Sequence, residues 1–293
     1  MIESCLDALF QMAPAFTPVV VDNASSDDTV ERVRTRTGVR LVANRDNRGF
    51  AAAVNQGARE AGQAEFLLLL NPDACLATPL DDLIEAGRHR GLAAGKLVGQ
   101  DDRAQKGFSL RRFPTPAALV FELLGLNRVW PCNPVNRHYR YLDRDLDQPG
   151  PVEQPAGAFL IARRDVWERL GGLDEQFHPV WFEDVDFCRR AADAGYRIEY
   201  VPSVTARHAG GHSVNQVPRQ YRAMYWCDSL LRYAVKHFRP LAYRGVCAAV
   251  MVSAVPRMVV GMIQERSLTP VAMYFKILKL ASRRLVSTQR PAA

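Results

Sequence analysis

The chain has 293 residues, of which 48% are hydrophobic and 24% charged, a globular composition that excludes a disordered chain and allows one large α/β domain with an appendage or two small domains. The net charge is +7, but 13 Lys and Arg face two acidic residues from Arg219 onward, so +11 lies in this tail and −4 in the preceding part. A basic tail indicates a phosphate-bearing partner; anionic lipid is favoured over nucleic acid because no nucleic-acid-binding motif accompanies the charge.

The N-terminal residues 2–12 have the spacing of an amphipathic helix, and no predicted strand precedes them. Residues 1–14 lack a basic region followed by a long apolar run, so no secretory signal is expected. The cysteines are scattered without a CxxC pair, which predicts reduced, packing cysteines and no disulfide framework or zinc site. These cysteines are Cys5, Cys75, Cys132, Cys188, Cys227 and Cys247.

The first predicted strand, residues 18–22, ends at Asp22 and is followed by Asn23 and a helix through Arg36. A carboxylate at the carboxyl end of such a strand can accept hydrogen bonds from a nucleobase or ribose. A plain loop role for Asp22 is the alternative.

A second short strand, residues 39–43, leads into a turn containing Asn47, Arg48 and Gly49 and then a helix that carries Asn55. Gly49 permits a close approach of the backbone to a ligand, and the helix directs its N-terminal amides at the space above the sheet. Arg48 and Asn55 are candidates for contacts to a diphosphate.

The third strand, residues 66–70, is a run of five large apolar residues, which is typical of a strand covered on both faces. Pro72 ends it and delivers Asp73 to the carboxyl edge of the sheet, where open α/β sheets bind ligands. Asn71 and Asp73 are also ordinary turn formers and caps. Three successive strands that end in polar turns nevertheless predict a nucleotide cleft.

The middle of the chain is less informative. Residues 92–98 and 107–112 are predicted strands, and Pro114 and Pro116 precede a short helix that ends near Leu124. The segment 127–151 has no clear periodicity and is predicted to be a long loop, either a lid or a linker.

A further strand begins near Gly157, where the absence of a side chain would let a ligand lie close. The carboxylates Glu183, Asp184 and Asp186 then open a helix. Acidic residues in a first turn are favoured by the helix dipole, so a structural role is one interpretation. Their crowding beside Trp181 and Phe182 favours another, in which a carboxylate acts as a base and the aromatic rings stack on a sugar.

Several of these motifs, in this order and spacing, resemble the inverting family-two glycosyltransferases, in particular bacterial rhamnosyltransferase-like members. The matching pieces lie between about Val19 and His212: residues 20–27, Asn47-Arg48-Gly49-Phe50 with Asn55, Leu70-Asn71-Pro72-Asp73, Gly157-Ala158-Phe159, Phe182-Glu183-Asp184-Val185-Asp186, Gly195-Tyr196, Val201-Pro202 and residues 204–208. The resemblance implies the GT-A fold, a three-layer α/β/α sandwich with a mostly parallel central sheet and a C-terminal helical appendage. The family's first strand is apparently missing here, either because the start is assigned too late or because the chain lacks that strand.

The resemblance also implies roles. Asp184 would be the catalytic base, with Glu183 beside it; Asp73, in the position of the family's DxD motif, would hold Mg²⁺ or Mn²⁺ on the donor diphosphate, and His208 would approach the metal. A strand-ending histidine in a structural hydrogen bond is the alternative for His208. The residues expected to bind substrate are Asp22, Asn23, Asn47, Arg48, Gly49, Asn55, Asn71, Gly157, Trp181, Phe182 and Asp186. Asn71 stands where the DxD motif has its first aspartate, so Asp73 would be the one carboxylate of this motif that can bind the metal.

One base and one metal fit a direct displacement with inversion, because a retaining reaction would need a second placed nucleophile, for which the sequence offers no candidate. The expected donor is dTDP-rhamnose or a UDP-sugar, and the expected acceptor is a glycan or lipid-linked glycan of the cell envelope. The alternative is a catalytically inactive, truncated relative that binds glycans or partners as a scaffold.

We expect a glycosyltransferase domain over residues 1–215, with a nucleotide-binding half to about residue 100, and basic amphipathic helices over residues 216–293. The run 246–263 is apolar except for Ser253 and Arg257, and Arg257 makes it marginal for spanning a membrane. We therefore expect peripheral contact with the inner face of the plasma membrane of a cytoplasmic protein. Packing of these helices on the catalytic domain is the alternative.

Overall fold

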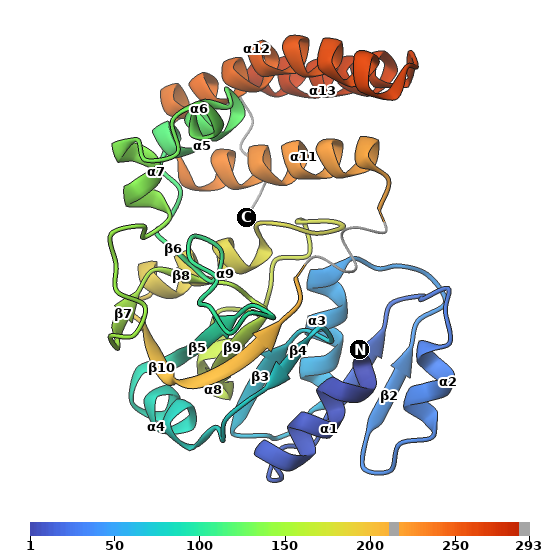
Figure 1. Ribbon diagram of the computed structural model, residues 1–293, viewed down its shortest axis with the longest axis vertical. Coiled ribbons are helices and arrows are strands. Elements are labelled where there is room, and N and C mark those ends of the chain that lie inside the picture. The colour runs from blue at the N-terminus through green and yellow to red at the C-terminus, as the bar shows by residue number, and fades with distance from the viewer. Residues whose placement is uncertain (211–216, 287–293) are drawn as a thin grey trace.

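The computed structural model describes residues 1–210 and 217–286, which form a layered α/β part and, at its far end, a group of helices (Figure 1). The strands are β1 (Val19–Asp22), β2 (Arg40–Ala43), β3 (Phe66–Leu70), β4 (Ala74–Leu76), β5 (Gly91–Val98), β6 (Leu110–Arg111), β7 (Gly150–Val152), β8 (Gln154–Pro155), β9 (Phe159–Arg163) and β10 (Arg197–His208). The helices are α1 (Ile2–Met12), α2 (Thr29–Arg34), α3 (Phe50–Glu60), α4 (Asp81–Arg90), α5 (Pro116–Leu123), α6 (Leu126–Val129), α7 (Pro134–Tyr139), α8 (Arg164–Arg169), α9 (Glu183–Asp193), α11 (Arg219–His237), α12 (Pro240–Glu265) and α13 (Thr269–Val286).

The central sheet has six strands in the order β3-β9-β5-β10-β4, with β7 pairing to β10. In the described part of the chain, β5 and β10 are its parallel pair, and its other pairings are antiparallel. The α/β layering is confirmed, but a mostly parallel sheet is wrong: the sheet is mixed. An apolar run indicates that a strand is covered on both faces, but it does not indicate whether the strand runs parallel or antiparallel to its neighbours.

The strands β1 and β2 pair in parallel as a separate two-stranded sheet, with Val19 opposite Arg40 and Asp22 opposite Ala43. The three strands expected in one sheet are therefore divided, since β3 pairs with β9 instead. The first element in the described chain is α1, a helix, as expected.

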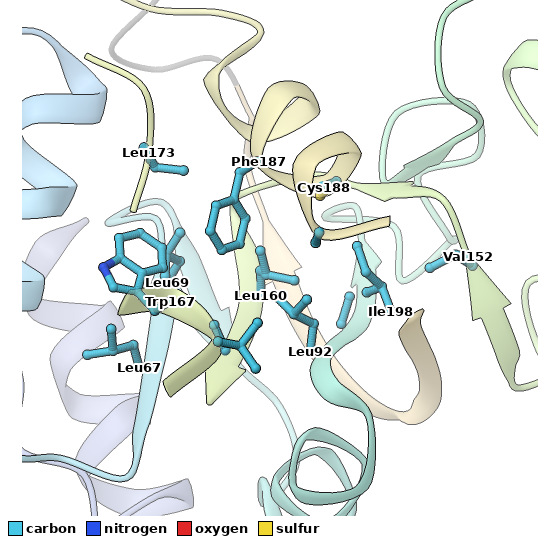
Figure 2. Close-up of a cluster of buried hydrophobic side chains, with 14 of the residues drawn as sticks. Leu67, Leu69, Leu92, Val152, Leu160, Trp167, Leu173, Phe187, Cys188 and Ile198 are labelled. Atoms are coloured by element: carbon cyan, nitrogen blue, oxygen red, sulfur yellow. The ribbon is translucent and has the colours of Figure 1, made fainter. Parts of the chain in front are cut away.

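Both faces of the six-stranded sheet are covered. On one face, Leu67 and Leu69 of β3 share a buried cluster with Trp167 of α8 and Phe187 of α9 (Figure 2). On the other, the alternate residues of β3 pack against a second cluster that includes Leu83 of α4. This arrangement explains the unbroken apolar run of β3, because successive side chains of a strand point to opposite faces.

The segment 127–151 is not one long loop, and that prediction is wrong. It contains part of α6, all of α7 and the start of β7. Asn133 caps α7 by accepting a hydrogen bond at Oδ1 from the backbone N–H of Asn136 over 2.8 Å, and Pro134 occupies the first turn. This Asn-Pro signal was present in the sequence.

The C-terminal helices pack on one another and on α5 around a hydrophobic cluster that includes Leu231, Val250 and Ile277. The guanidinium of Arg257 donates to the carbonyl of Leu123 at the end of α5 over 2.9 Å, which ties α12 to the α/β part. The expected domain boundary at residues 215 and 216 and the tail 287–293 lie outside the described residues.

Candidate active site

Several strand ends meet at one edge of the six-stranded sheet. Leu70, the last residue of β3, pairs with Phe159, the first residue of β9. His208, the last residue of β10, pairs with Ala74 at the start of β4. The turn 71–73 and the segment preceding β9 therefore lie at the same edge as His208, as a cleft above the sheet requires.

A chain of hydrogen bonds joins Asp184 to this edge. The backbone N–H of Asn71 donates to the carbonyl of Ala158 over 3.1 Å, and the backbone N–H of Gly157 donates to Oδ2 of Asp184 over 3.0 Å. A Cβ at Gly157 would lie 3.0 Å from the Cβ of Asp184, so glycine permits this approach. Asp184 is half-buried, and its Oδ1 accepts the backbone N–H of Val185. These bonds bring the turn of Asp73 and the carboxylate of Asp184 to the same edge of the sheet.

His208 faces Asp73 across 3.4 Å from its Nε2 to Oδ1, and both side chains are buried. Nδ1 of His208 lies 3.0 Å from Oε1 of Gln105, whose Nε2 donates to the backbone carbonyl of His208 over 2.8 Å. Because Gln105 thus presents its oxygen to the ring, Nδ1 of His208 is the donor in this contact, and Nε2 is the ring nitrogen that faces Asp73. Phe108 stacks on the imidazole at 5.4 Å between ring centroids and fixes its plane.

This pair has the donor set of a cation site. Nε2 of His208 is buried without a hydrogen-bond partner, and a lone pair opposite a carboxylate is stabilised by a cation or proton between them. A carboxylate and an imidazole oriented through Nδ1–H suit a divalent metal. Within residues 1–210 and 217–286, no group of three or more His, Cys, Asp or Glu could hold a metal ion. Two protein ligands suffice for Mg²⁺ when substrate phosphates and water complete its shell.

The segment that carries the acidic residues has an unusual backbone. Trp181 and Phe182 both have positive φ, 79° and 69°, and Phe182 is the N-cap of α9. Glu183 is buried, and its Oε2 has no hydrogen-bond partner. Burial, followed by the neighbouring charge of Asp184, raises the pKa of Glu183 well above its ordinary value. The two adjacent carboxyl groups are therefore placed in different environments.

At the end of β1, Asn23 organises the turn before α3. Its Nδ2 donates to Oδ1 of Asn47 over 2.9 Å and to the carbonyl of Gly49, and its Oδ1 accepts the backbone N–H of Arg48. The Arg48 side chain is exposed. Asp22 is buried at the end of β1 and accepts the backbone N–H of Ser25 at Oδ1.

This turn is tied to the acidic segment, because the backbone N–H of Phe50 donates to the carbonyl of Pro179 over 2.7 Å. A Cβ at Gly49 would lie 2.8 Å from the ring of His178. Residues 178–179 therefore take the space beside Gly49, and a contact between Gly49 and a ligand stays a prediction.

Three other residues expected to contact substrate have their side chains engaged inside the protein. Asn55 donates to the carbonyl of Leu173 over 2.8 Å and accepts the N–H of Leu173, so its amide holds a loop rather than a diphosphate. Phe182 is buried against Tyr233 at 5.5 Å between ring centroids. Asp186 is fully buried and paired with Arg190, Lys236 and His237.

Trp181 is half-buried and packs at the edge of the C-terminal helical cluster, and Asn71 and Gly157 lie in the hydrogen-bonded chain described above. The roles of these residues and of Asp73, Asp184 and His208 stay predictions.

Sequence reasoning missed Gln105 and Phe108, which orient His208 from a segment 100 residues earlier. It also missed Ser229, Tyr233 and His237 of α11, which contact the acidic segment. The sequence shows that these three residues are four apart and share one face of a helix. It does not show that this face contacts the acidic segment.

Comparisons with known proteins identify the family of the chain and relate its fold to solved structures. A family model described as "Glycosyl transferase family 2" matches residues 1–164, and one described as "Glycosyltransferase like family 2" matches residues 115–225. An N-acetylglucosaminyl-diphospho-decaprenol L-rhamnosyltransferase of Mycobacterium tuberculosis is 28% identical over 233 residues, which cover 75% of each chain. The rhamnosyltransferase WbbL of Escherichia coli K12 is 26% identical over 57% of this chain and 60% of its own.

Among solved structures, a mannosyltransferase from Pyrobaculum calidifontis, in complex with GDP-Man and Mn²⁺, superimposes with a TM-score of 0.50 at 19% identity. The similarity covers 98% of this chain and 84% of the mannosyltransferase chain. At this identity the likeness concerns the fold.

Proposed function

Because the chain belongs to glycosyl transferase family 2 and has the GT-A fold, we propose that it transfers a sugar from a nucleotide-diphosphate sugar to an acceptor hydroxyl in cell-envelope glycan synthesis. The observation that carries the proposal is the hydrogen-bonded chain linking Asp184, through Gly157 and Ala158, to the turn of Asp73 beside His208. A base and a cation site at one sheet edge are what direct sugar transfer needs.

Asp184 acts as the base. Its Oδ2 is oriented by the N–H of Gly157, so the carboxylate is held for the acceptor hydroxyl, whose proton it accepts as the hydroxyl attacks the anomeric carbon. One attack from one face inverts that carbon. Glu183 lies next to the base, and its raised pKa lets it hold a proton there and limits the charge beside Asp184.

Asp73 and His208 would hold Mg²⁺ or Mn²⁺, which would neutralise the charge that develops on the leaving diphosphate. Gln105 keeps the imidazole of His208 in the tautomer that presents Nε2 to this position. The half-buried Asn71 continues the same turn and orders it through the carbonyl of Ala158.

The donor is dTDP-rhamnose or a UDP-sugar, and the acceptor is a glycan or a lipid-linked glycan. Support comes from relatives named as rhamnosyltransferases, one of which is named for an N-acetylglucosaminyl-diphospho-decaprenol acceptor. A polyprenyl diphosphate acceptor lies in the membrane, so the enzyme works at the cytoplasmic face of the plasma membrane.

The helix α12 supports this location. It is the one helix in the described part of the chain that is long and apolar enough to cross a membrane. From Val252 to Ile263, exposed apolar side chains recur along it at intervals of three or four residues and form one stripe, about 17 Å long at 1.5 Å per residue. The stripe, called here the α12 stripe, consists of Val252, Val255, Val259 and Ile263.

The α12 helix lies on the membrane rather than across it. Its opposite side is buried against α11 and α13, and Arg257 is bound to α5 carbonyls. The neighbouring helix α13, which packs along α12, carries the exposed basic residues Lys276, Lys279 and Arg283. An apolar stripe beside basic residues is typical of a helix at an anionic lipid surface.

The test is transfer by the purified protein from dTDP-rhamnose or UDP-sugars to N-acetylglucosaminyl-diphospho-decaprenol with Mn²⁺. The proposal expects a product of inverted anomeric configuration by NMR and a transfer rate that is roughly 10²- to 10⁴-fold lower in a folded Asp184→Asn variant. An inactive wild type that still binds glycans would instead favour the scaffold function, and an active Asp184→Asn variant would remove the base assignment.

A further inference from the structure

The backbone immediately before Asp184 adopts a conformation that it does not hold on its own. Trp181 and Phe182 are consecutive non-glycine residues with φ of 79° and 69°. L-residues disfavour this region because Cβ crowds the backbone, so two in succession persist only where neighbouring contacts hold them. The direction in which α9 begins, and with it the position of Asp184, depends on those contacts.

The contacts come from α11, outside the glycosyltransferase sheet. Oγ of Ser229 donates to the carbonyl of Val180 over 3.0 Å, and the ring of Tyr233 packs on Phe182 at 5.5 Å between centroids. Ser229 and Tyr233 are themselves fully buried. The helix α11 thus contacts this turn at Val180 and at Phe182.

One helical turn further along, α11 also contacts Asp186, which follows Glu183 and Asp184 in the chain. Nε2 of His237 lies 2.7 Å, and Nζ of Lys236 2.8 Å, from Oδ1 of Asp186. Nε of Arg190 donates to Oδ2 of Asp186 over 2.7 Å, so both carboxylate oxygens are used. Asp186 is fully buried, so its carboxylate depends on these partners.

Ser229, Tyr233 and His237 are spaced by four residues and share one face of α11. Their contacts at Val180, Phe182 and Asp186 lie on both sides of Glu183 and Asp184. We infer that the face of α11 formed by Ser229, Tyr233 and His237 supports the catalytic apparatus, and that Ser229 and His237 are positioning residues that act through this segment on the carboxylate of Asp184. The inference rests on the proposed function, because it assigns these residues to the same reaction.

The experiment uses the full chain with the variants Ser229→Ala, His237→Ala and His237→Gln. Glutamine retains an N–H donor near the position of Nε2, so it tests rescue. Arg232→Ala is the matched control, because Arg232 pairs with Asp228 within α11 and not with α9. For each variant we would measure kcat, the affinity for the nucleoside diphosphate of the donor by calorimetry with Mn²⁺, and thermal unfolding. Ser229→Ala is also combined with Asp184→Asn.

The expected result is a kcat roughly 10- to 100-fold lower in Ser229→Ala and His237→Ala, since a small misplacement of a catalytic group has effects of this size. Nucleoside diphosphate affinity should stay within about twofold of the wild type, and His237→Gln should recover most of the rate. Ser229→Ala should slow Asp184→Asn no further, because residues that act through one group are not additive. Arg232→Ala should match the wild type.

The inference is overturned if the wild type is active and the folded variants Ser229→Ala, His237→Ala and His237→Gln all have the wild-type kcat. It is also overturned if Ser229→Ala slows Asp184→Asn by the same factor by which it slows the wild type. Equal losses of kcat and nucleotide affinity would also overturn it, because they would indicate general loss of structure. A wild type that turns over no nucleotide sugar would overturn the proposed function itself. Failure of the inference and failure of the function are therefore distinguishable.

Discussion

The backbone N–H of Gly157 donates to Oδ2 of Asp184 over 3.0 Å, and the two residues are close enough that a Cβ on Gly157 would lie 3.0 Å from the Cβ of Asp184. This contact joins the segment before β9 to the start of α9. It is the step that brings a carboxylate from the second half of the chain to the edge where β3 and β10 end.

The first prediction tests that contact. Gly157→Ala should push Asp184 away and lower kcat roughly 10- to 100-fold, with the KM for the donor little changed, because the added methyl moves the base rather than the nucleotide. Steady-state kinetics measure this. Gly245→Ala is the control, since a Cβ there meets no atom within 4 Å. A Gly157→Ala enzyme with the kinetics of the wild type would contradict the geometry.

The second prediction concerns the metal. Chelation should abolish transfer, and Gln105→Leu should raise the Mn²⁺ concentration for half-maximal activity about 10- to 100-fold, because the residue that orients a metal-binding histidine contributes on this scale. Activity is titrated with MnCl₂. Asp102→Ala, which removes an exposed ion pair with Arg207, is the control. Identical Mn²⁺ dependence in Gln105→Leu and the control would argue against His208 as a ligand.

The third prediction follows from the raised pKa of Glu183. The folded protein holds this proton more tightly than the unfolded chain, whose glutamate titrates near about 4.3, so wild-type stability falls as pH rises from there towards the folded pKa. Glu183→Gln has no such proton. The difference in Tm, Glu183→Gln minus wild type, should therefore become more positive as the pH rises from 4 to 8. A Tm difference that is constant across this range would show that the carboxyl titrates normally.

The fourth prediction concerns Asp186. Burial alone would raise its pKa, but the hydrogen bond from His237, the charge of Arg190 and the hydrogen bonds from Lys236 and Arg190 together outweigh burial and lower the pKa to about 2. A lowered pKa contributes stability that is present above about pH 4, where an unfolded aspartate ionises, and is lost as pH falls towards 2. Asp186→Asn should lower the free energy of unfolding by roughly 2 to 3 kcal/mol at pH 7, and by less near pH 2.

Urea unfolding across this pH range measures the effect of Asp186→Asn. The control is Asp193→Asn in the same helix, which removes an exposed pair with Arg189 and should change stability by less than about 1 kcal/mol. Equal effects of the two substitutions at pH 7 would mean that the buried network does not stabilise the fold.

The fifth prediction concerns the α12 stripe. Val255→Asp with Val259→Asp should reduce flotation with phosphatidylglycerol liposomes roughly tenfold or more, because each buried valine contributes about 1.5 to 3 kcal/mol and an added carboxylate is repelled by anionic lipid. Gln11→Asp with Thr37→Asp adds the same charge at exposed positions of the α/β part. If both double variants float equally, the stripe does not face the lipid.

Much of the site was predictable because its signals are local. The apolar run that ends at Leu70, the turn with Pro72 and the acidic start of α9 are each encoded within a few residues, and the family resemblance orders them. A buried strand, a turn former and a helix start follow from side-chain type and backbone restriction alone.

What the sequence determined by itself is therefore the set of elements and the residue types at their ends. Tertiary structure decided the direction of β9 in the sheet, the use of Asn55 and Asp186 as internal ties, and the support of Asp184 by α11. The physical reason is that the sequence gives the type of a polar side chain but not its partner, which can be a ligand or a backbone carbonyl far away in the chain. Only the folded chain determines which partner satisfies it.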